Sequence, residues 1–262
     1  MAVIDFVLIS IYQTQEKYVK IERWIKMKIY DSSADDLWTA LNISSQKGPV
    51  LSVVGAGGKS SVIRHLSNVL NHRKVRHYIG TTTHMWPMDG GLYGKQIGTV
   101  DKDGKVGPPC EEVWSKIFSE GCPVLIEADG SKGLPCKVPE AWEPVLRKET
   151  THVLGVIGVS CLDKEISKIC HRPECVAKLL NCRQEDRLKP EHLVEIIKSK
   201  DGLYKNVDTS WKYHVILNQV DDEHIYHKIM KMKESLKSET IDGIWFTHML
   251  HEIENTDNGD VV

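Results

Sequence analysis

The stretch Leu51-Ser-Val-Val-Gly55-Ala-Gly57-Gly58-Lys59-Ser60-Ser61 decides the fold of this chain, because an apolar segment runs into glycines, a lysine and two serines. Residues 59–70 carry apolar side chains at helical spacing, so the stretch predicts a strand, a tight turn and a helix in direct succession. Glycines allow the backbone N–H groups of such a turn to converge on one point. The sequence therefore predicts an α/β domain with an anion-binding turn near its start.

The rest of the chain alternates short β-branched segments with helical ones, a pattern typical of βαβ units around a mostly parallel sheet. A short helix ending at Leu41 is predicted, with Ser33 as its N-cap. Residues 85–109 are rich in glycine and are expected to form a hairpin or a mobile loop. Strands are predicted at 50–54, 75–81, 124–128, 152–157, 213–217 and 242–246, and helices at 59–70, 110–119, 173–180, 190–199 and 223–237. The expected architecture is a P-loop NTPase-like three-layer α/β fold.

Residues 1–26 are predicted to be an N-terminal extension, because a second methionine, Met27, precedes a segment that resembles a fresh domain start. Their apolar run, 2–12, lacks a basic flank and is too short to span a bilayer, so a strand or a disordered segment is expected. Residues 27–253 form the predicted P-loop α/β domain. The polar residues 254–262 are predicted to be a flexible tail.

The charge of the chain is nearly balanced, with a formal net charge of -2 over 262 residues. Neither nucleic acid nor a membrane surface is therefore expected as a partner, and an anionic ligand would have to be held locally. The seven cysteines contain no Cys-x-x-Cys pair, which argues against a disulfide framework and favours a reducing, cytoplasmic location. A helix from Pro173 would spread the thiols around Cys170 and Cys175, so structural or solvent-exposed cysteines are favoured over a metal cluster.

The glycine-rich turn is predicted to bind the phosphates of a nucleotide through its backbone and the N-terminus of the following helix. Its lysine would neutralise phosphate charge, and the first serine could ligate Mg²⁺. The leading glycine of the pattern G-x-x-x-x-G-K-[ST] would fall at Val53, so the loop is shorter or shaped differently. A glycine-rich turn with a solvated lysine is the alternative. The predicted binding residues are Gly55, Ala56, Gly57, Gly58, Lys59, Ser60 and Ser61.

The apolar strand at 124–128 ends in two carboxylates, Glu127 and Asp129, which strand alternation places on one face. Both could approach a magnesium ion or its water shell together with Ser60. Lys59, Glu127 and Asp129 are therefore the predicted catalytic residues. Acidic residues also often close a strand beside a turn, and this is the alternative interpretation.

Three threonines stand at the end of the predicted strand 75–81, at the edge of the sheet where parallel strands bind ligands. We expect Thr82 to join the metal shell or sense the γ-phosphate, and Thr81 and Thr83 to contact a substrate. Threonines at strand ends also form turns, so both interpretations stay open. Further along, His171 and Arg172 are candidates for contact with an anion or substrate, as is the segment that begins at Lys132.

Asn218 and Asp221 stand three apart after a predicted buried strand, an arrangement similar to the guanine-recognition pattern N-K-x-D. In that pattern the aspartate accepts hydrogen bonds from the base, and the asparagine contacts N7 and helps to hold the loop. Gln219 replaces the lysine, so the base stays open between GTP and ATP. A plain turn at the end of a strand is the alternative.

Taken in order, several segments of the chain resemble the YqeC family, described as selenium-dependent hydroxylase accessory proteins or selenium cofactor biosynthesis proteins. The most distinctive segment is Glu127-Ala-Asp-Gly-Ser-Lys-Gly133, and Glu127-Ala-Asp-Gly130 also resembles the Glu-x-x-Gly signature of metallochaperone GTPases. The resemblance implies a P-loop fold and a role in maturing selenium-dependent molybdenum hydroxylases, with a client enzyme or a cofactor-maturation protein as partner. The segments that carry it are 54–60, 81–83, 125–135, 143–144, 156–158, 171–174 and 217–221.

The leading hypothesis for function is a Mg²⁺-dependent nucleotide switch that hydrolyses GTP or ATP, slowly in the absence of its partner. A second hypothesis is transfer of a phosphoryl or nucleotidyl group to a small cofactor, with His171, Arg172 and the segment 132–137 forming the second substrate site. A third is a non-catalytic adaptor that binds nucleotide only for stability.

Overall fold

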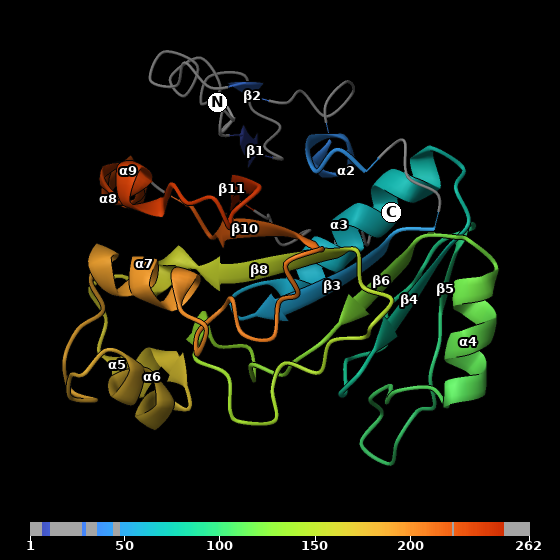
Figure 1. Ribbon diagram of the computed structural model, residues 1–262, viewed down its shortest axis with the longest axis horizontal. Helices are drawn as coiled ribbons and strands as arrows, with labels where there is room; N and C mark the ends of the chain where they lie inside the picture. The colour runs from blue at the N-terminus through green and yellow to red at the C-terminus, as the bar shows by residue number, and fades with distance from the viewer. Residues whose placement is uncertain (1–6, 11–27, 30–35, 44–47, 222, 249–262) are drawn as a thin grey trace, which may run out of the picture.

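The computed structural model describes residues 7–10, 28–29, 36–43, 48–221 and 223–248, which form an α/β fold around a large parallel sheet (Figure 1). Within this part of the chain the sheet has nine strands in the order β2-β1-β11-β10-β8-β3-β6-β4-β5, and every neighbouring pair runs parallel. The strands are β1 (Val7–Ser10), β2 (Lys28–Ile29), β3 (Val50–Gly55), β4 (His77–Thr81), β5 (Gly94–Gln96), β6 (Val124–Glu127), β8 (His152–Gly158), β10 (Lys212–Asn218) and β11 (Gly243–His248).

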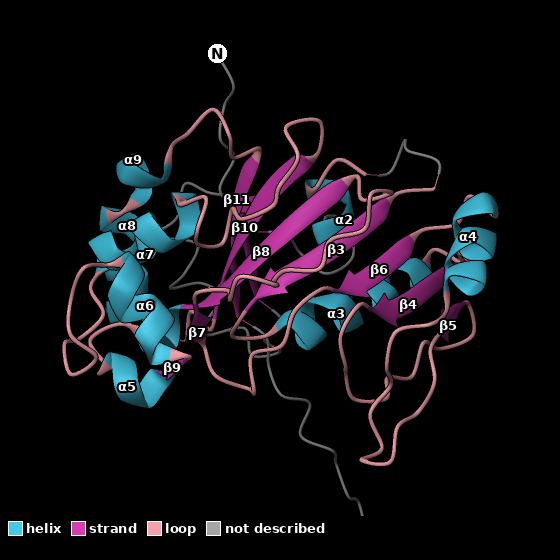
Figure 2. Cartoon of the chain, turned by 60° about the horizontal axis from the view of Figure 1, so that its bottom comes forward, coloured by secondary structure: helices cyan, strands magenta, loops and turns pink. Residues whose placement is uncertain are grey.

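A second, small parallel sheet joins β7 (Cys136–Lys137) to β9 (Cys170–His171). Figure 2 shows α5, α6 and α7 beside the part of the main sheet that holds β8, β10 and β11, and α4 at the opposite edge. The helices are α2 (Leu37–Ala40), α3 (Lys59–His72), α4 (Glu111–Ser119), the 3-10 helix η1 (Val159–Cys161), α5 (Ile166–Ile169), α6 (Pro173–Leu179), α7 (Pro190–Lys198), α8 (Glu223–Lys231) and α9 (Lys233–Leu236).

Helices cover both faces of the sheet, which gives the three-layer fold that the sequence predicts. Val53 of β3 packs in the cluster that contains Leu66 of α3, whereas its neighbour Val54 packs in the cluster that contains Ile196 of α7. Successive side chains of a strand point to opposite faces, so both faces of β3 are buried. This explains why four of the five residues of the predicted strand 50–54 are apolar, where a strand with one exposed face would alternate.

The six predicted strands and the helices α3, α4, α6 and α7 are confirmed, with ends within two residues of the predicted ones. The single helix predicted at 223–237 is instead two helices, α8 and α9. Ser33 lies outside the described residues, and the N-cap of α2 is Asp36, whose Oδ1 accepts a hydrogen bond from the Thr39 N–H at 2.9 Å. A carboxylate placed three residues before that N–H is a common cap, so the prediction was wrong in choosing the serine.

Of the two alternatives predicted for the segment 85–109, the structure favours the hairpin, and it adds a strand that was not predicted. Its residues Gly94–Gln96 form β5, which extends the sheet beyond β4 in parallel, and Val106 makes antiparallel bridges to Met85 and Val100. Within the predicted extension 1–26, Val7–Ser10 form β1, which pairs with β11. The domain boundaries at 26 and 253 stay predictions.

None of the helices in the described part of the chain has both the length and the apolar character that crossing a membrane would require.

Candidate functional site

The turn between β3 and α3 takes a shape that only glycine accommodates. Gly57 and Gly58 have φ of 82° and 126°, values that side-chain-bearing residues rarely adopt. A Cβ on Gly58 would lie 2.1 Å from Nδ2 of Asn218, and one on Gly57 would lie 2.4 Å from the backbone nitrogen of Gly158. The glycines of the motif therefore let the turn pack closely against the ends of β8 and β10.

The backbone N–H groups of the turn divide into two sets. Those of Ala56 and Gly57 donate to the carbonyls of Val156 and Leu134, and that of Gly55 donates to both carboxylate oxygens of Asp129 at 3.1 and 3.0 Å. No acceptor among the described residues faces the N–H groups of 58–61, which form the N-terminus of the 14-residue helix α3. The first three residues thus hold the turn in place, and the next four can receive an anion.

Lys59 is buried, with its side chain 3% exposed. Its Nζ donates to the carbonyl of Gly55 at 2.8 Å and to Oγ of Ser131 at 3.2 Å, and lies 3.3 Å from Oδ1 of Asp129. Burying an ammonium group is costly unless acceptors surround it, as they do here. The alternative of a solvated lysine is therefore excluded.

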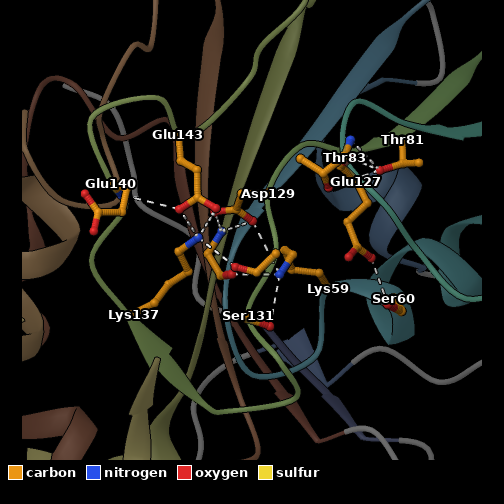
Figure 3. A network of polar contacts seen from close by, with 12 residues as sticks. Lys59, Ser60, Thr81, Thr83, Glu127, Asp129, Ser131, Lys137, Glu140 and Glu143 are labelled. Carbon is orange, nitrogen blue, oxygen red and sulfur yellow. Dashed lines mark hydrogen bonds and ion pairs between the residues drawn. The ribbon is translucent and has the colours of Figure 1, made fainter. Parts of the chain in front are cut away.

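Lys59 is the first member of a series of alternating charges, which we call the charge chain (Figure 3). Nζ of Lys137 lies 3.1 Å from Oδ2 of Asp129 and 2.8 Å from Oε2 of Glu143. The guanidinium of Arg172 completes the series by pairing with the same Glu143 oxygen. Burial alone would raise the pKa of Glu143, but the hydrogen bonds from Lys137 and Arg172 outweigh it and lower the pKa.

Ser60 and Glu127 form a second polar pair beside Lys59. The Ser60 hydroxyl donates to Oε2 of Glu127 at 2.8 Å. Burial raises the pKa of Glu127 and nearby Asp129 adds to the rise, whereas Lys59 and the Ser60 hydrogen bond oppose it. The structure thus brings together two of the predicted metal ligands, Ser60 and Glu127, while Asp129 faces Gly55 and the lysines.

The threonines at the end of β4 form hydrogen bonds through their hydroxyls to neighbouring segments. Thr81 donates to the carbonyl of Glu127 at 2.8 Å and accepts from the Thr83 N–H at 3.0 Å, and the Thr82 hydroxyl donates to the carbonyl of Val145 at 2.8 Å. These contacts position Glu127 from the neighbouring strand. The predicted contacts of the three threonines with metal or substrate stay predictions.

Asn218 braces the glycine turn from β10. Its Nδ2 donates to the carbonyl of Gly57 at 2.6 Å, its Oδ1 accepts from the Thr247 hydroxyl at 2.8 Å, and the residue is 2% exposed. Gln219 has a φ of 66° and accepts a hydrogen bond from Ser160, and Asp221 is exposed. Both polar atoms of Asn218 are thus engaged within the protein, and its predicted contact with a base stays a prediction.

Of the remaining predicted substrate residues, Arg172 ends the charge chain and His171 lies beside Lys137. His171 is buried and is the register partner of Lys137 in the small sheet. Burial lowers its pKa, with further lowering by Arg172, Lys137 and Lys132. Lys132 itself is exposed. Sequence reasoning missed the roles of Lys137 and Glu143, although a lysine inside the apolar run 135–139 signals a buried cation that needs a partner.

The cysteines are all free: Cys136, Cys161 and Cys170 are buried in the core, and Cys110 is exposed. Cys175 lies with Glu140 and Glu174 in a group whose possible ligand atoms are within 4.8 Å of one another. No sequence pattern indicated this group, because Glu140 is 34 and 35 positions from its neighbours in the chain.

The all-parallel sheet between helices and the glycine turn with its buried lysine define a P-loop NTPase-like α/β protein. The family model described as "YqeC protein" matches residues 51–99 and 95–174. The "Uncharacterized protein YqeC" of Escherichia coli (strain K12) is 29% identical over 238 residues, which cover 82% of this chain and 93% of the relative. Both matches confirm the resemblance to the YqeC family that is seen in the motifs of the chain. No solved structure matches the chain.

Proposed function

We propose that this protein binds a nucleoside triphosphate, GTP or ATP, together with Mg²⁺ and hydrolyses it. The observation that carries the proposal is the position of Lys59: a buried ammonium group beside four backbone N–H groups at the start of α3. Helix N-termini favour anions because their N–H groups and the helix dipole point at the ligand. A lysine at the same place adds a full positive charge.

The phosphate group would replace contacts that Lys59 already makes. In the present arrangement Lys59 is 3.3 Å from the Asp129 carboxylate, so binding exchanges one anionic partner for another. Asp129 keeps the N–H of Gly55 and the ammonium of Lys137 after such an exchange. The exchange therefore leaves no buried charge without a partner, which would otherwise be costly.

Ser60 and Glu127 offer the oxygen atoms that a magnesium ion prefers. Their side-chain oxygens are 2.8 Å apart at the start of α3, beside the proposed phosphate position. A cation would also offset the unfavourable burial of the Glu127 carboxylate, whose pKa is raised by desolvation. Magnesium supplies charge neutralisation on the phosphates when it is bound, and Glu127 would hold it directly or through water.

Titration calorimetry with the full-length protein tests this proposal, using GTP and ATP in turn, each with and without Mg²⁺. We expect saturable binding that is tighter with Mg²⁺. Lys59→Ala should weaken it about 10- to 100-fold, since a hydrogen bond to a charged group contributes about 1.5–3 kcal/mol. Lys116→Ala, which removes an exposed lysine of α4, is the matched control and should bind normally. Equal affinities in the Lys59 variant and the wild type would contradict the proposal.

The proposed biological setting is maturation of selenium-dependent molybdenum hydroxylases. The support for this setting is the similarity to the YqeC family alone. In a strain that lacks the gene, the activity of such a hydroxylase should fall, and the wild-type gene but not the Lys59→Ala variant should restore it. Full hydroxylase activity without the gene would separate the nucleotide chemistry from this role.

A further inference from the structure

The charge chain connects the proposed phosphate site to the protein surface. Each inner member is shared between two oppositely charged neighbours: Asp129 between Lys59 and Lys137, and Lys137 between Asp129 and Glu143. Glu143 is in turn shared between Lys137 and Arg172. A shared partner that moves toward one neighbour weakens its contact with the other, so a displacement at Lys59 has consequences along the series.

Burial makes these contacts strong enough to be coupled. The side chains of Lys59, Asp129, Lys137 and Glu143 are between 1% and 6% exposed. Salt and water screen such charges far less than they screen charges at the surface. The four groups are also close to one another, so no intermediate side chain is needed to carry a change.

The chain ends at an aromatic residue on the surface. The guanidinium of Arg172 lies 5.6 Å from the ring centroid of Trp142, within the range of a cation–π contact. Trp142 is 66% exposed, while the Arg172 side chain is 22% exposed. The position of Arg172 is therefore set by Glu143 on the buried side and by Trp142 on the outer side.

We propose that the charge chain transmits occupancy of the phosphate site to the Arg172–Trp142 contact, so that the surface around Trp142 differs between the free and nucleotide-bound protein. This inference rests on the proposed nucleotide binding at Lys59. When Lys59 turns to phosphate, Asp129 draws Lys137 more strongly. The contact between Lys137 and Glu143 then weakens, so Glu143 interacts mainly with Arg172. The guanidinium of Arg172 is drawn toward Glu143 and away from the Trp142 ring.

The coupling must act in both directions, because the effect of one site on the affinity of another is reciprocal. A partner that takes Arg172 away from Glu143 would return Lys137 to Glu143. Asp129 would then compete with phosphate for Lys59 more strongly. The Arg172–Trp142 contact and the affinity for nucleotide are thus coupled in both directions.

Fluorine NMR of the full-length protein labelled with 5-fluorotryptophan tests the inference. The Trp142→Phe variant assigns the Trp142 resonance, which should shift on addition of Mg²⁺ with GTP or ATP. Trp86 is the matched control: it is 63% exposed and has Lys105 5.1 Å from its ring, but Lys105 is outside the charge chain. The Trp86 resonance should shift much less.

The Glu143→Gln variant separates transmission from direct contact. It keeps the size of the side chain but removes its charge, so nucleotide should still bind in calorimetry while the shift at Trp142 is lost. Should this variant not fold, Arg172→Gln cuts the chain at its surface end and should give the same result. Binding without a Trp142 shift in the wild type, or a shift that survives both variants, would overturn the inference and leave the proposed function intact. An absence of nucleotide binding would overturn both.

Discussion

The buried carboxylate of Glu127 is the group of the candidate site best placed to bind a cation or to act on water. Its carboxylate is 7% exposed, receives a hydrogen bond from Ser60, and lies on β6 next to the strand that leads into the glycine turn. Burial raises its pKa, so its charged form is less favourable than in water. A carboxylate in this situation gains from a nearby cation and can also orient or accept a proton from water.

At the scale of this residue we predict that Glu127→Gln lowers the rate of phosphate release about 100-fold or more, as expected for loss of a group that acts on the reacting water. The amide keeps the hydrogen bond from Ser60, so nucleotide affinity without Mg²⁺ should change little. Phosphate release under saturating GTP and ATP measures the effect. Glu112→Gln, on the exposed face of α4, is the control. Unchanged turnover in the Glu127 variant would show that this carboxylate takes no part in hydrolysis.

At the scale of elements, β10 supports the β3–α3 turn through a single side chain. Asn218 closes the gap between the strand and the turn, with hydrogen bonds to Gly57 on one side and Thr247 of β11 on the other. The contact with Gly57 spans 161 positions in the chain. An asparagine in this role holds the turn through contacts within the protein alone.

Asn218→Ala therefore distinguishes two roles for this residue, support of the glycine turn and recognition of the base. If Asn218 is a brace, the affinities for GTP and ATP should fall by the same factor, and the free energy of unfolding should drop by about 1–3 kcal/mol because buried partners lose their hydrogen bonds. Calorimetry and urea denaturation measure these quantities. Asn68→Ala, on the exposed side of α3, serves as the control. A loss of affinity for GTP alone would instead assign Asn218 to base recognition.

At the scale of the whole molecule, the two ends of the sheet have different roles. The candidate site lies where β3, β6 and β10 end. His152 is at the other end of the sheet, where β8 begins, and its ring stacks on that of His214 with the ring centroids 6.0 Å apart. Burial lowers the pKa of His152 to about 4 and that of His214 to about 3, although Asp242 opposes both shifts. Both histidines are therefore neutral in the folded protein near neutral pH.

Acid should destabilise the protein through this pair. For a histidine whose pKa is lower in the folded than in the unfolded protein, the free energy of unfolding is greatest above the unfolded pKa of 6.5, where the ring is neutral in both states. Below pH 6.5 the unfolded chain binds protons that the folded chain does not, and each histidine costs up to about 1.4 kcal/mol per pH unit until its folded pKa is reached. Urea denaturation at pH 7.5, 6.0 and 5.0 measures the slope.

The double variant His152→Gln/His214→Phe should flatten this pH dependence between pH 6.5 and 5. His72→Gln, which removes an exposed imidazole at the end of α3, should leave it as in the wild type. An unchanged slope in the double variant would assign the acid sensitivity to other groups.

The sequence by itself determined six strands of the main sheet, the helices α3, α4, α6 and α7, and the glycine turn. Residues 50–61 predicted a strand, a turn and a helix, and the structure has β3, the turn and α3 at these positions. Apolar periodicity and glycine preference depend on neighbours in the chain, so they can be interpreted locally. The edge strand β5 was missed because its three residues, Gly94–Gln96, carry no apolar pattern and form a strand only beside β4.

Only the tertiary structure decided which charges meet. Lys59 reaches Asp129 across 70 positions, and Arg172 reaches Glu143 across 29, through elements that come together when the sheet forms. No local pattern encodes these pairs, because a buried ammonium or carboxylate takes whichever opposite charge the packing brings close enough to offset its lost hydration. The motif therefore pointed to the turn, whereas folding assigned Asp129 to Lys59 and Asn218 to the backbone of Gly57.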